Sequence, residues 1–197
     1  MTTKLIIIDG MDNTGKSTLI KRLTNVLEQL GHTTITIHSQ KPPKDIKPEE
    51  TSKYQHDYYT DLINKLVELK HEHKYDYIIL DRGWISEYVY GPLYRNRAKQ
   101  EIVEDNIVLD KKVLSEFDAC TGIYLIMMLG TTDFLLKQED GKSLSKNSKK
   151  LIDIERNEFE KGFSYSLISK KSYYMVNNEN SYIEILPDVC KDIFYYN

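Results

Sequence analysis

Residues 10–17 read GMDNTGKS, which matches the phosphate-binding pattern G-x-x-x-x-G-K-[ST]. The glycines of this pattern let the backbone turn so that successive N–H groups converge on one concavity, where a polyphosphate replaces water. Lys16 then reaches the β- and γ-phosphates, and the Ser17 hydroxyl ligates Mg²⁺. The residues predicted to bind ATP through its phosphates are Gly10, Asn13, Thr14, Gly15, Lys16, Ser17 and Thr18.

The flanking sequence places this loop between a strand and a helix. Residues 4–9 are a short apolar run that ends in a carboxylate, as expected of a central strand buried on both faces. Apolar residues then recur three and four apart over residues 19–30, and Gly31 is suited to end an amphipathic helix. Residues 33–38 alternate isoleucine with polar residues and predict a second strand. Strand, loop, helix and strand make a βαβ unit, which is the setting that this motif needs.

The rest of the chain continues the alternation of strands and helices. Residues 40–52 hold three prolines and predict a loop. The further strands expected are residues 77–81, 123–129 and 173–176. The further helices expected are a segment ending near residue 73, residues 84–117 with an interruption at Gly91-Pro92, residues 133–138, 151–169 and 182–195. For residues 182–195 the alternative is a strand followed by a helix that starts at Pro187. We therefore predict an α/β P-loop kinase fold in one domain, residues 1–197: three αβα layers, a five-stranded parallel sheet and a lid-like segment at about 139–150.

Length and composition exclude several classes of protein. A chain of 197 residues is long enough for one α/β domain and short for two. No apolar run approaches the length of a membrane span, and the first residues lack the features of a secretory signal. Cys120 and Cys190 are isolated, which indicates free thiols in a reducing cytoplasm. The net charge of −3 disfavours a long polyanionic partner.

A second group of polar residues follows the third predicted strand, where Asp81 and Arg82 stand side by side. In an open parallel sheet, ligands bind beyond the carboxyl ends of the strands. A carboxylate there can hold Mg²⁺ or its water, and an arginine can bridge the donor and acceptor phosphates as charge develops. We predict Lys16, Asp81 and Arg82 as catalytic residues, and Ser17 and Asp81 as metal ligands.

These stretches resemble the thymidylate kinase family of deoxynucleoside monophosphate kinases. Residues 8–18 are similar to that family's loop, in which the residue at the place of Asp12 contacts the 3′-hydroxyl of the sugar. Residues 81–86 match the family's D-R-x-x-x-S signature, and residues 87–95 look more like bacteriophage-encoded members. The order of elements matches over nearly the whole chain. We predict Asp12, Tyr58, Trp84, Glu87, Tyr90 and Arg95 as acceptor-binding residues. Among them, Tyr58 and Trp84 could stack on a base, as could Tyr54 and Tyr59.

The chain also departs from the family pattern around the acceptor. An Arg-Glu-Pro motif follows the second strand in the cellular enzymes, whereas residues 38–42 read HSQKP here. The family helix before the third strand carries a phenylalanine and an arginine, whereas residues 54–59 offer tyrosines and no arginine. The lid holds only lysines as basic residues. Arg95, Arg97 and Arg156 are candidates to supply the missing positive charge.

Three functions follow from these observations. Transfer to a phosphate needs no general base, and no carboxylate stands directly after the second strand, so a deoxynucleoside monophosphate such as dTMP is the first choice. The alternative acceptor is 5-hydroxymethyluracil in phage DNA, with Asp12, Asp81 or Glu87 as base. A third alternative is a nucleotide-binding switch without transfer activity. The resemblance leaves a homodimer open.

Overall fold

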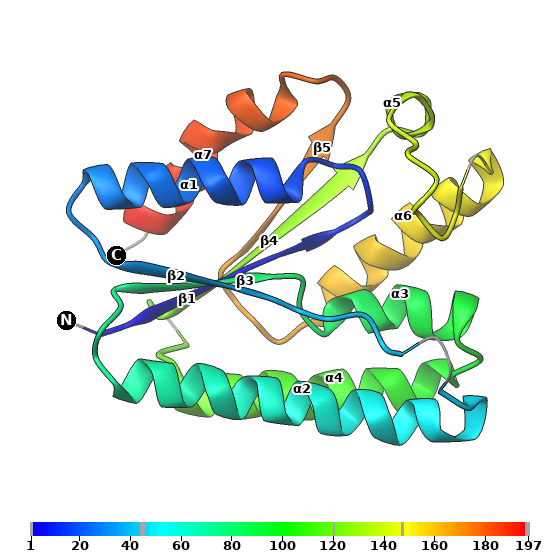
Figure 1. The fold of residues 1–197 in the computed structure, drawn as a ribbon, viewed down its shortest axis with the longest axis horizontal. Coiled ribbons are helices and arrows are strands. Elements are labelled where there is room, and N and C mark those ends of the chain that lie inside the picture. The colour runs from blue at the N-terminus through cyan, green and yellow to red at the C-terminus, as the bar shows by residue number, and fades with distance from the viewer. Residues whose placement is uncertain (1, 44–45, 120, 147, 196–197) are drawn as a thin grey trace.

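The computed structural model describes residues 2–43, 46–119, 121–146 and 148–195, and it contains one five-stranded sheet (Figure 1). All strands are parallel, in the order β2-β3-β1-β4-β5. The strands are β1 (Lys4–Gly10), β2 (Thr34–His38), β3 (Tyr77–Asp81), β4 (Ile123–Gly130) and β5 (Lys171–Val176). The predicted five-stranded parallel sheet is confirmed, and each strand agrees with its predicted range to within two residues.

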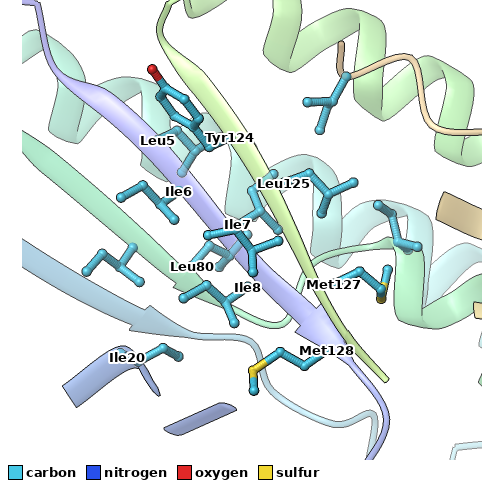
Figure 2. Packing of buried hydrophobic residues seen from close by; sticks show 14 of the residues in the cluster. Leu5, Ile6, Ile7, Ile8, Ile20, Leu80, Tyr124, Leu125, Met127 and Met128 are labelled. Carbon is cyan, nitrogen blue, oxygen red and sulfur yellow. The ribbon is translucent and has the colours of Figure 1, made fainter. Parts of the chain in front are cut away.

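The three middle strands form the core because their sequences are apolar almost throughout. Every residue of β3 and β4 is buried, as is every residue of β1 after Lys4. Figure 2 shows how side chains of residues 5–8 pack between those of the two neighbouring strands. In the edge strands β2 and β5, half-buried residues alternate with exposed ones over much of each strand. The carboxyl ends of β1 and β3, where the predicted site residues lie, are therefore fixed by the most buried part of the molecule.

Helices cover both faces of the sheet (Figure 1). On one face lie α1 (Lys16–Gln29) and α7 (Ser181–Tyr195), which pack against each other. The other face carries α2 (Pro48–His71), α3 (Ile85–Tyr94), α4 (Lys99–Glu116) and α6 (Lys149–Tyr165), while the short α5 (Thr132–Lys137) follows β4. The apolar stripe of α1 is buried, and Gly31 has a φ of 85° just beyond the helix end. The three-layer αβα prediction is confirmed.

Three helix boundaries differ from the sequence prediction. The helix α2 starts inside the predicted loop, at Pro48, because a proline in the first turn gives up no helical hydrogen bond. The break expected at Gly91-Pro92 lies instead after Tyr94. Gly91 is inside α3 because the Ile102 side chain of α4 occupies the space that a Cβ would need. The helix α6 ends at Tyr165, four residues early, whereas the C-terminal helix holds Pro187 as expected.

Candidate active site

The loop between β1 and α1 has the backbone that its glycines predict. Gly10 has a φ of 129°, and a Cβ there would collide with the backbone carbonyl of Met128 on β4. Gly15 caps α1 with a φ of 79°. Asn13 has a φ of 61°, in the left-handed region that asparagine enters more readily than most residues. The loop shape is therefore set by its own residues and by the close approach of β4.

Lys16 turns its ammonium group back onto this loop. The side chain is buried, and Nζ donates to the carbonyl oxygen of Gly10 over 3.0 Å and to that of Met11. Burial, together with the nearby Arg82 guanidinium, lowers the pKa of Lys16 to about 7, against the opposing effect of neighbouring carboxylates. A polyphosphate in the loop would supply the negative charge that favours the protonated lysine.

The lowered pKa of Lys16 predicts a pH dependence of stability for the nucleotide-free protein. Between pH 7 and 10.5 the folded protein binds fewer protons here than the unfolded chain. The contribution of this group to the free energy of unfolding therefore rises with pH in that window and is lost as the pH falls through 7. Lys16→Met should flatten the rise. Denaturant unfolding of both proteins at about pH 6.5, 8 and 9 measures this, and parallel profiles would contradict it.

Asp9 ties the phosphate loop to the start of α3. Its carboxylate is fully buried and accepts hydrogen bonds from the Gly10 and Gly83 N–H groups over 2.8 and 3.1 Å. The Ser86 N–H and hydroxyl also donate to it. Burial raises the pKa of Asp9, against the effect of these donors. Asp9 thus supports two segments of the site, rather than facing a ligand itself.

Asp12 and Arg82 form an ion pair across the carboxyl ends of β1 and β3. Arg82 Nη2 donates to Asp12 Oδ1. Burial by itself would raise the pKa of Asp12, but the charges of Arg82 and Lys16 hold it below its ordinary value. Arg82 has a φ of 70°, a left-handed backbone that costs a non-glycine residue about 1–3 kcal/mol. Such strain is typical of a residue whose side-chain direction matters for function.

Asp81 and Ser17, the predicted metal ligands, line one cavity over the phosphate loop. The Asp81 carboxylate is mostly buried, and its Oδ2 lies 2.9 Å from His38 Nδ1. Within the described residues, no cluster of three or more histidine, cysteine or acidic side chains could hold a metal alone. Mg²⁺ prefers oxygen ligands and takes much of its shell from phosphates and water. One carboxylate and one hydroxyl therefore fit an ion that arrives with a nucleotide.

The cavity over the loop has a volume of about 340 Å³ and is termed the donor cavity. Six of the seven predicted phosphate-binding residues line it, namely 13–18, and Gly10 alone does not. The lid-like segment also contributes Asp140, Lys142 and Ser143 to the lining. The structure thus brings the predicted donor residues together around one space.

A second cavity, termed the acceptor cavity, is lined partly by residues from α2, α3 and the lid. Four predicted acceptor-binding residues line it: Asp12, Glu87, Tyr90 and Arg95. Tyr59, which the sequence offered as a possible stacking residue, also lines it, and so does Leu144, which sequence reasoning had not assigned to the site. Burial raises the pKa of Tyr59, which keeps its hydroxyl neutral.

Two of the predicted acceptor-binding residues lie elsewhere. Trp84 has no exposed surface, and its Nε1 donates to Asp110 over 2.7 Å, so its assignment to the acceptor is wrong and it is a core residue. Tyr58 does not line the cavity either, because its hydroxyl oxygen accepts from the Gln40 N–H over 2.6 Å. Successive helical residues point about 100° apart, so the adjacent Tyr59 faces the cavity instead.

Three residues line both cavities: Asp12, Lys41 and Arg82. They mark the boundary that a group passing from one cavity to the other must cross. Sequence reasoning had not assigned Lys41 to the site. Its position in the sequence could have indicated a role in the site, because Lys41 follows the second strand in the stretch that replaces the family's Arg-Glu-Pro motif.

Of the three candidate arginines, only Arg95 lines the acceptor cavity. Its Nη1 donates to Glu87 Oε1. Arg97 is buried behind this pair, where it donates to Asp105 over 2.7 Å. Arg156 bonds the backbone at the end of β4 and lines neither cavity.

Other features lie away from these cavities. A cavity of about 250 Å³ lies at the amino ends of β4 and β5, away from the phosphate loop. Cys190 is a free, half-buried thiol, whereas Cys120 lies outside the described residues. Within the described ranges, none of the helices combines the length and the apolar character that crossing a membrane requires.

No protein-family model and no curated protein matches the sequence. Solved structures do match. Thymidylate kinase from Ehrlichia chaffeensis superposes with a TM-score of 0.64 at 10% identity, over 97% of this chain and 98% of that one. The YorR protein from Bacillus subtilis, solved in complex with phosphorylated GDP, gives a TM-score of 0.60 at 15% identity, over 95% and 94%. The chain therefore has the three-layer αβα fold of thymidylate kinase-like P-loop kinases.

Proposed function

We propose that this protein is a kinase that uses Mg·ATP to phosphorylate a deoxynucleoside monophosphate, most simply dTMP to dTDP. The observation that carries the proposal is the sharing of Asp12, Lys41 and Arg82 by two cavities. A phosphoryl group moving from donor to acceptor crosses this boundary, where these side chains can contact it. The fold supports nucleotide substrates, because its neighbours include a thymidylate kinase and a protein solved with phosphorylated GDP.

The residues that line the two cavities have distinct tasks in this reaction. Lys16 and the loop N–H groups hold the donor phosphates, since they line the donor cavity. Arg82 compensates the charge that develops between donor and acceptor, and its ion pair with Asp12 keeps its guanidinium in place. When bound, Mg²⁺ neutralises charge on the β- and γ-phosphates, and Ser17 and Asp81 are the residues that would hold it.

The charges of the acceptor cavity suit a phosphate-bearing acceptor. Three cationic side chains line it, those of Lys41, Arg82 and Arg95, against the two anionic side chains of Asp12 and Glu87. The excess of positive charge attracts a dianion, and a phosphate oxygen is already ionised. Transfer to it needs no general base.

The lid segment has to move for an acceptor to bind. In this structure the acceptor cavity has a volume of about 30 Å³, which is too small for a nucleotide. Leu144 of the lid forms part of its wall. The lid is anchored next to this wall, because Glu155 of α6 accepts hydrogen bonds from Ser145 and from the Tyr94 hydroxyl. We therefore infer a closed arrangement that opens to admit substrate.

A second candidate acceptor is the hydroxymethyl group of 5-hydroxymethyluracil in DNA. It is favoured by the helix α2, which has no arginine for a monophosphate and contributes Tyr59 to the cavity. A hydroxyl acceptor needs a base, and Asp12 and Glu87 are carboxylates in the cavity lining. The net charge of −3 opposes a DNA substrate.

One assay separates these functions. The protein is incubated with Mg²⁺ and γ-labelled ATP, beside dTMP and the other deoxynucleoside monophosphates, thymidine, and DNA that contains 5-hydroxymethyluracil. We expect label in a monophosphate and none in thymidine. Label in the DNA alone would replace the first choice by the second, and label in no acceptor would indicate a nucleotide switch.

The role of Asp12 gives a further prediction within this assay. If its ionised carboxylate accepts a hydrogen bond from the sugar 3′-hydroxyl, the 2′,3′-dideoxy form of the acceptor should lose about 10- to 150-fold in kcat/KM. Asp12→Asn should shrink this ratio. An equal loss for both acceptors in the variant would place the role of Asp12 elsewhere.

A further inference from the structure

The cavity of about 250 Å³ at the amino ends of β4 and β5 has no part in the proposed reaction. Its lining comprises residues 124–126 of β4, residues 169–172 around the start of β5, and Asp192 and Ile193 of α7. None of these residues lines the donor or the acceptor cavity. The volume is just below the roughly 300–1,000 Å³ of most small-molecule sites. A ligand smaller than a nucleotide could therefore bind here at the same time as the substrates.

A buried hydroxyl in this lining has no hydrogen-bond partner. It belongs to Tyr124, which is 3% exposed, and no atom of the described residues pairs with its oxygen. Figure 2 shows the hydroxyl at the margin of the apolar cluster that the Tyr124 ring joins. Buried polar groups are nearly always paired, and a tyrosine hydroxyl can both donate and accept. The oxygen therefore marks a point where a ligand completes the pairing.

Positive charge gathers beside this hydroxyl. Leu125 pairs with Lys171 in the register of the two strands. The preceding residues, Tyr124 and Lys170, therefore lie side by side on one face of the sheet, and Lys170 Nζ is 5.1 Å from the centre of the Tyr124 ring. Lys4 lies nearby at the start of β1, where burial and the charge of Lys170 lower its pKa. An anion beside these ammonium groups would reduce their repulsion.

Two further charged residues line the cavity, Lys171 and Asp192. Lys171 points to the opposite face of the sheet, where its Nζ donates to carbonyl oxygens at the end of α6 over 2.7 and 2.9 Å. Asp192 Oδ2 accepts hydrogen bonds from the hydroxyls of Ser172 and Tyr174. The cavity therefore presents its positive charge at Lys170, next to the unpaired hydroxyl, and both of these groups can donate. A ligand that fits them carries a negatively charged acceptor.

We propose that this cavity is a binding site for a small organic anion, which is neither the donor nor the acceptor of the phosphoryl group. A carboxylate or phosphate oxygen of this ligand accepts hydrogen bonds from the Tyr124 hydroxyl and the Lys170 ammonium group. Its apolar part packs against Ile126 and Ile193, which line the same cavity. Hydrogen bonds to a charged group are roughly twice as strong as neutral ones, so the site selects the charged form.

The probes that test this site are benzoate and phenyl phosphate, which carry the two kinds of anionic group, and benzamide, the neutral counterpart of benzoate. Each is titrated into isotope-labelled protein in the presence of Mg·ADP and dTMP. NMR follows the amide signals of residues 124–126 and 169–172. At least one anion should bind there, at least about tenfold more tightly than benzamide. The tighter of the two anions identifies the preferred head group.

Three variants assign the binding to this cavity. Tyr124→Phe removes only the hydroxyl and Lys170→Gln only the charge, and each should weaken binding of the anion about tenfold or more. Without ligand, Tyr124→Phe should have a Tm no lower than the parent, because the hydroxyl has no partner to lose. The matched control is Lys191→Gln, which removes an exposed lysine charge from α7 outside the cavity. Its affinity for the anion should equal that of the parent.

Four results would contradict the inference. Equal binding of the anions and benzamide would exclude selection by charge, and absence of binding at millimolar concentrations would exclude the site. Signal changes confined to residues 12–18 would place the anion in the donor cavity. A lower Tm or an unchanged affinity in Tyr124→Phe would show that the hydroxyl serves the protein and not a ligand. None of these results bears on phosphoryl transfer, which the assay with γ-labelled ATP measures separately.

Discussion

Replacing Lys16 with alanine is expected to lower the rate of phosphoryl transfer by at least about 100-fold while the protein stays folded. Lys16 lines the donor cavity, where its charge would act on the phosphates of a bound nucleotide. The substitution should cost little stability, because burial already disfavours the charged ammonium group and lowers its pKa to about 7. Steady-state turnover of ATP with the best acceptor measures the effect.

The matched control for this variant is Lys21→Ala. Lys21 lies on the same helix, is exposed and lines neither cavity. It should keep the parental rate, and both variants should unfold within a few degrees of the parent. If Lys16→Ala retains activity within about tenfold, the assignment of residues 10–17 as the phosphate loop is wrong.

Arg82→Ala is expected to lower kcat by roughly 1,000-fold, the second large effect at this site. Arg82 lines both cavities and is held by Asp12, so its charge is preorganised where the phosphoryl group passes. Arg82→Lys should recover part of the loss, because an ammonium keeps the charge and loses the planar fork of donors. Single-turnover rates separate the chemical step from product release.

Loss of Arg82 also leaves the Asp12 carboxylate without its partner. Asp12→Asn in the Arg82→Ala background provides the control, because it removes the uncompensated charge. If the double variant recovers full activity, the effect of Arg82 is electrostatic support of Asp12 and not contact with the phosphoryl group. A kcat for Arg82→Ala within about tenfold of the parent would exclude a role in transfer.

The sequence by itself determined the fold class and the donor side of the site. The predicted phosphate loop is contiguous, and its shape depends on backbone turns at its own glycines, Gly10 and Gly15. Local order is enough to specify such a loop, so residues 13–18 were predicted together and line one cavity. The central strands β1, β3 and β4 were predicted for the same reason, since burial on both faces makes each a continuous apolar run.

The prediction of a helix break at Gly91-Pro92 was wrong, because the glycine there allows two helices to pack closely. Gly91 and Pro92 have the local signature of a helix end, and the helix continues through them to Tyr94. The reason is Ile102, eleven residues further along, whose side chain fills the space beside Gly91. The contact between α3 and α4 outweighed the local preference of Gly91 and Pro92 to end a helix. The sequence pattern of one helix cannot reveal a contact with another helix.

Only the tertiary structure decided the acceptor side. Its cavity is assembled from the phosphate loop, the loop after β2, α2, α3 and the lid, which are far apart in the sequence. Trp84 and Tyr58 are residue types that stack on bases. In the folded chain, however, Trp84 is buried in the core and the Tyr58 hydroxyl is hydrogen-bonded to Gln40. The direction of each side chain depends on how the helices pack against the sheet. Residue type and spacing therefore predicted only some of the residues that line the acceptor cavity. The placing of Lys41 and Tyr59 at the cavity required the folded chain.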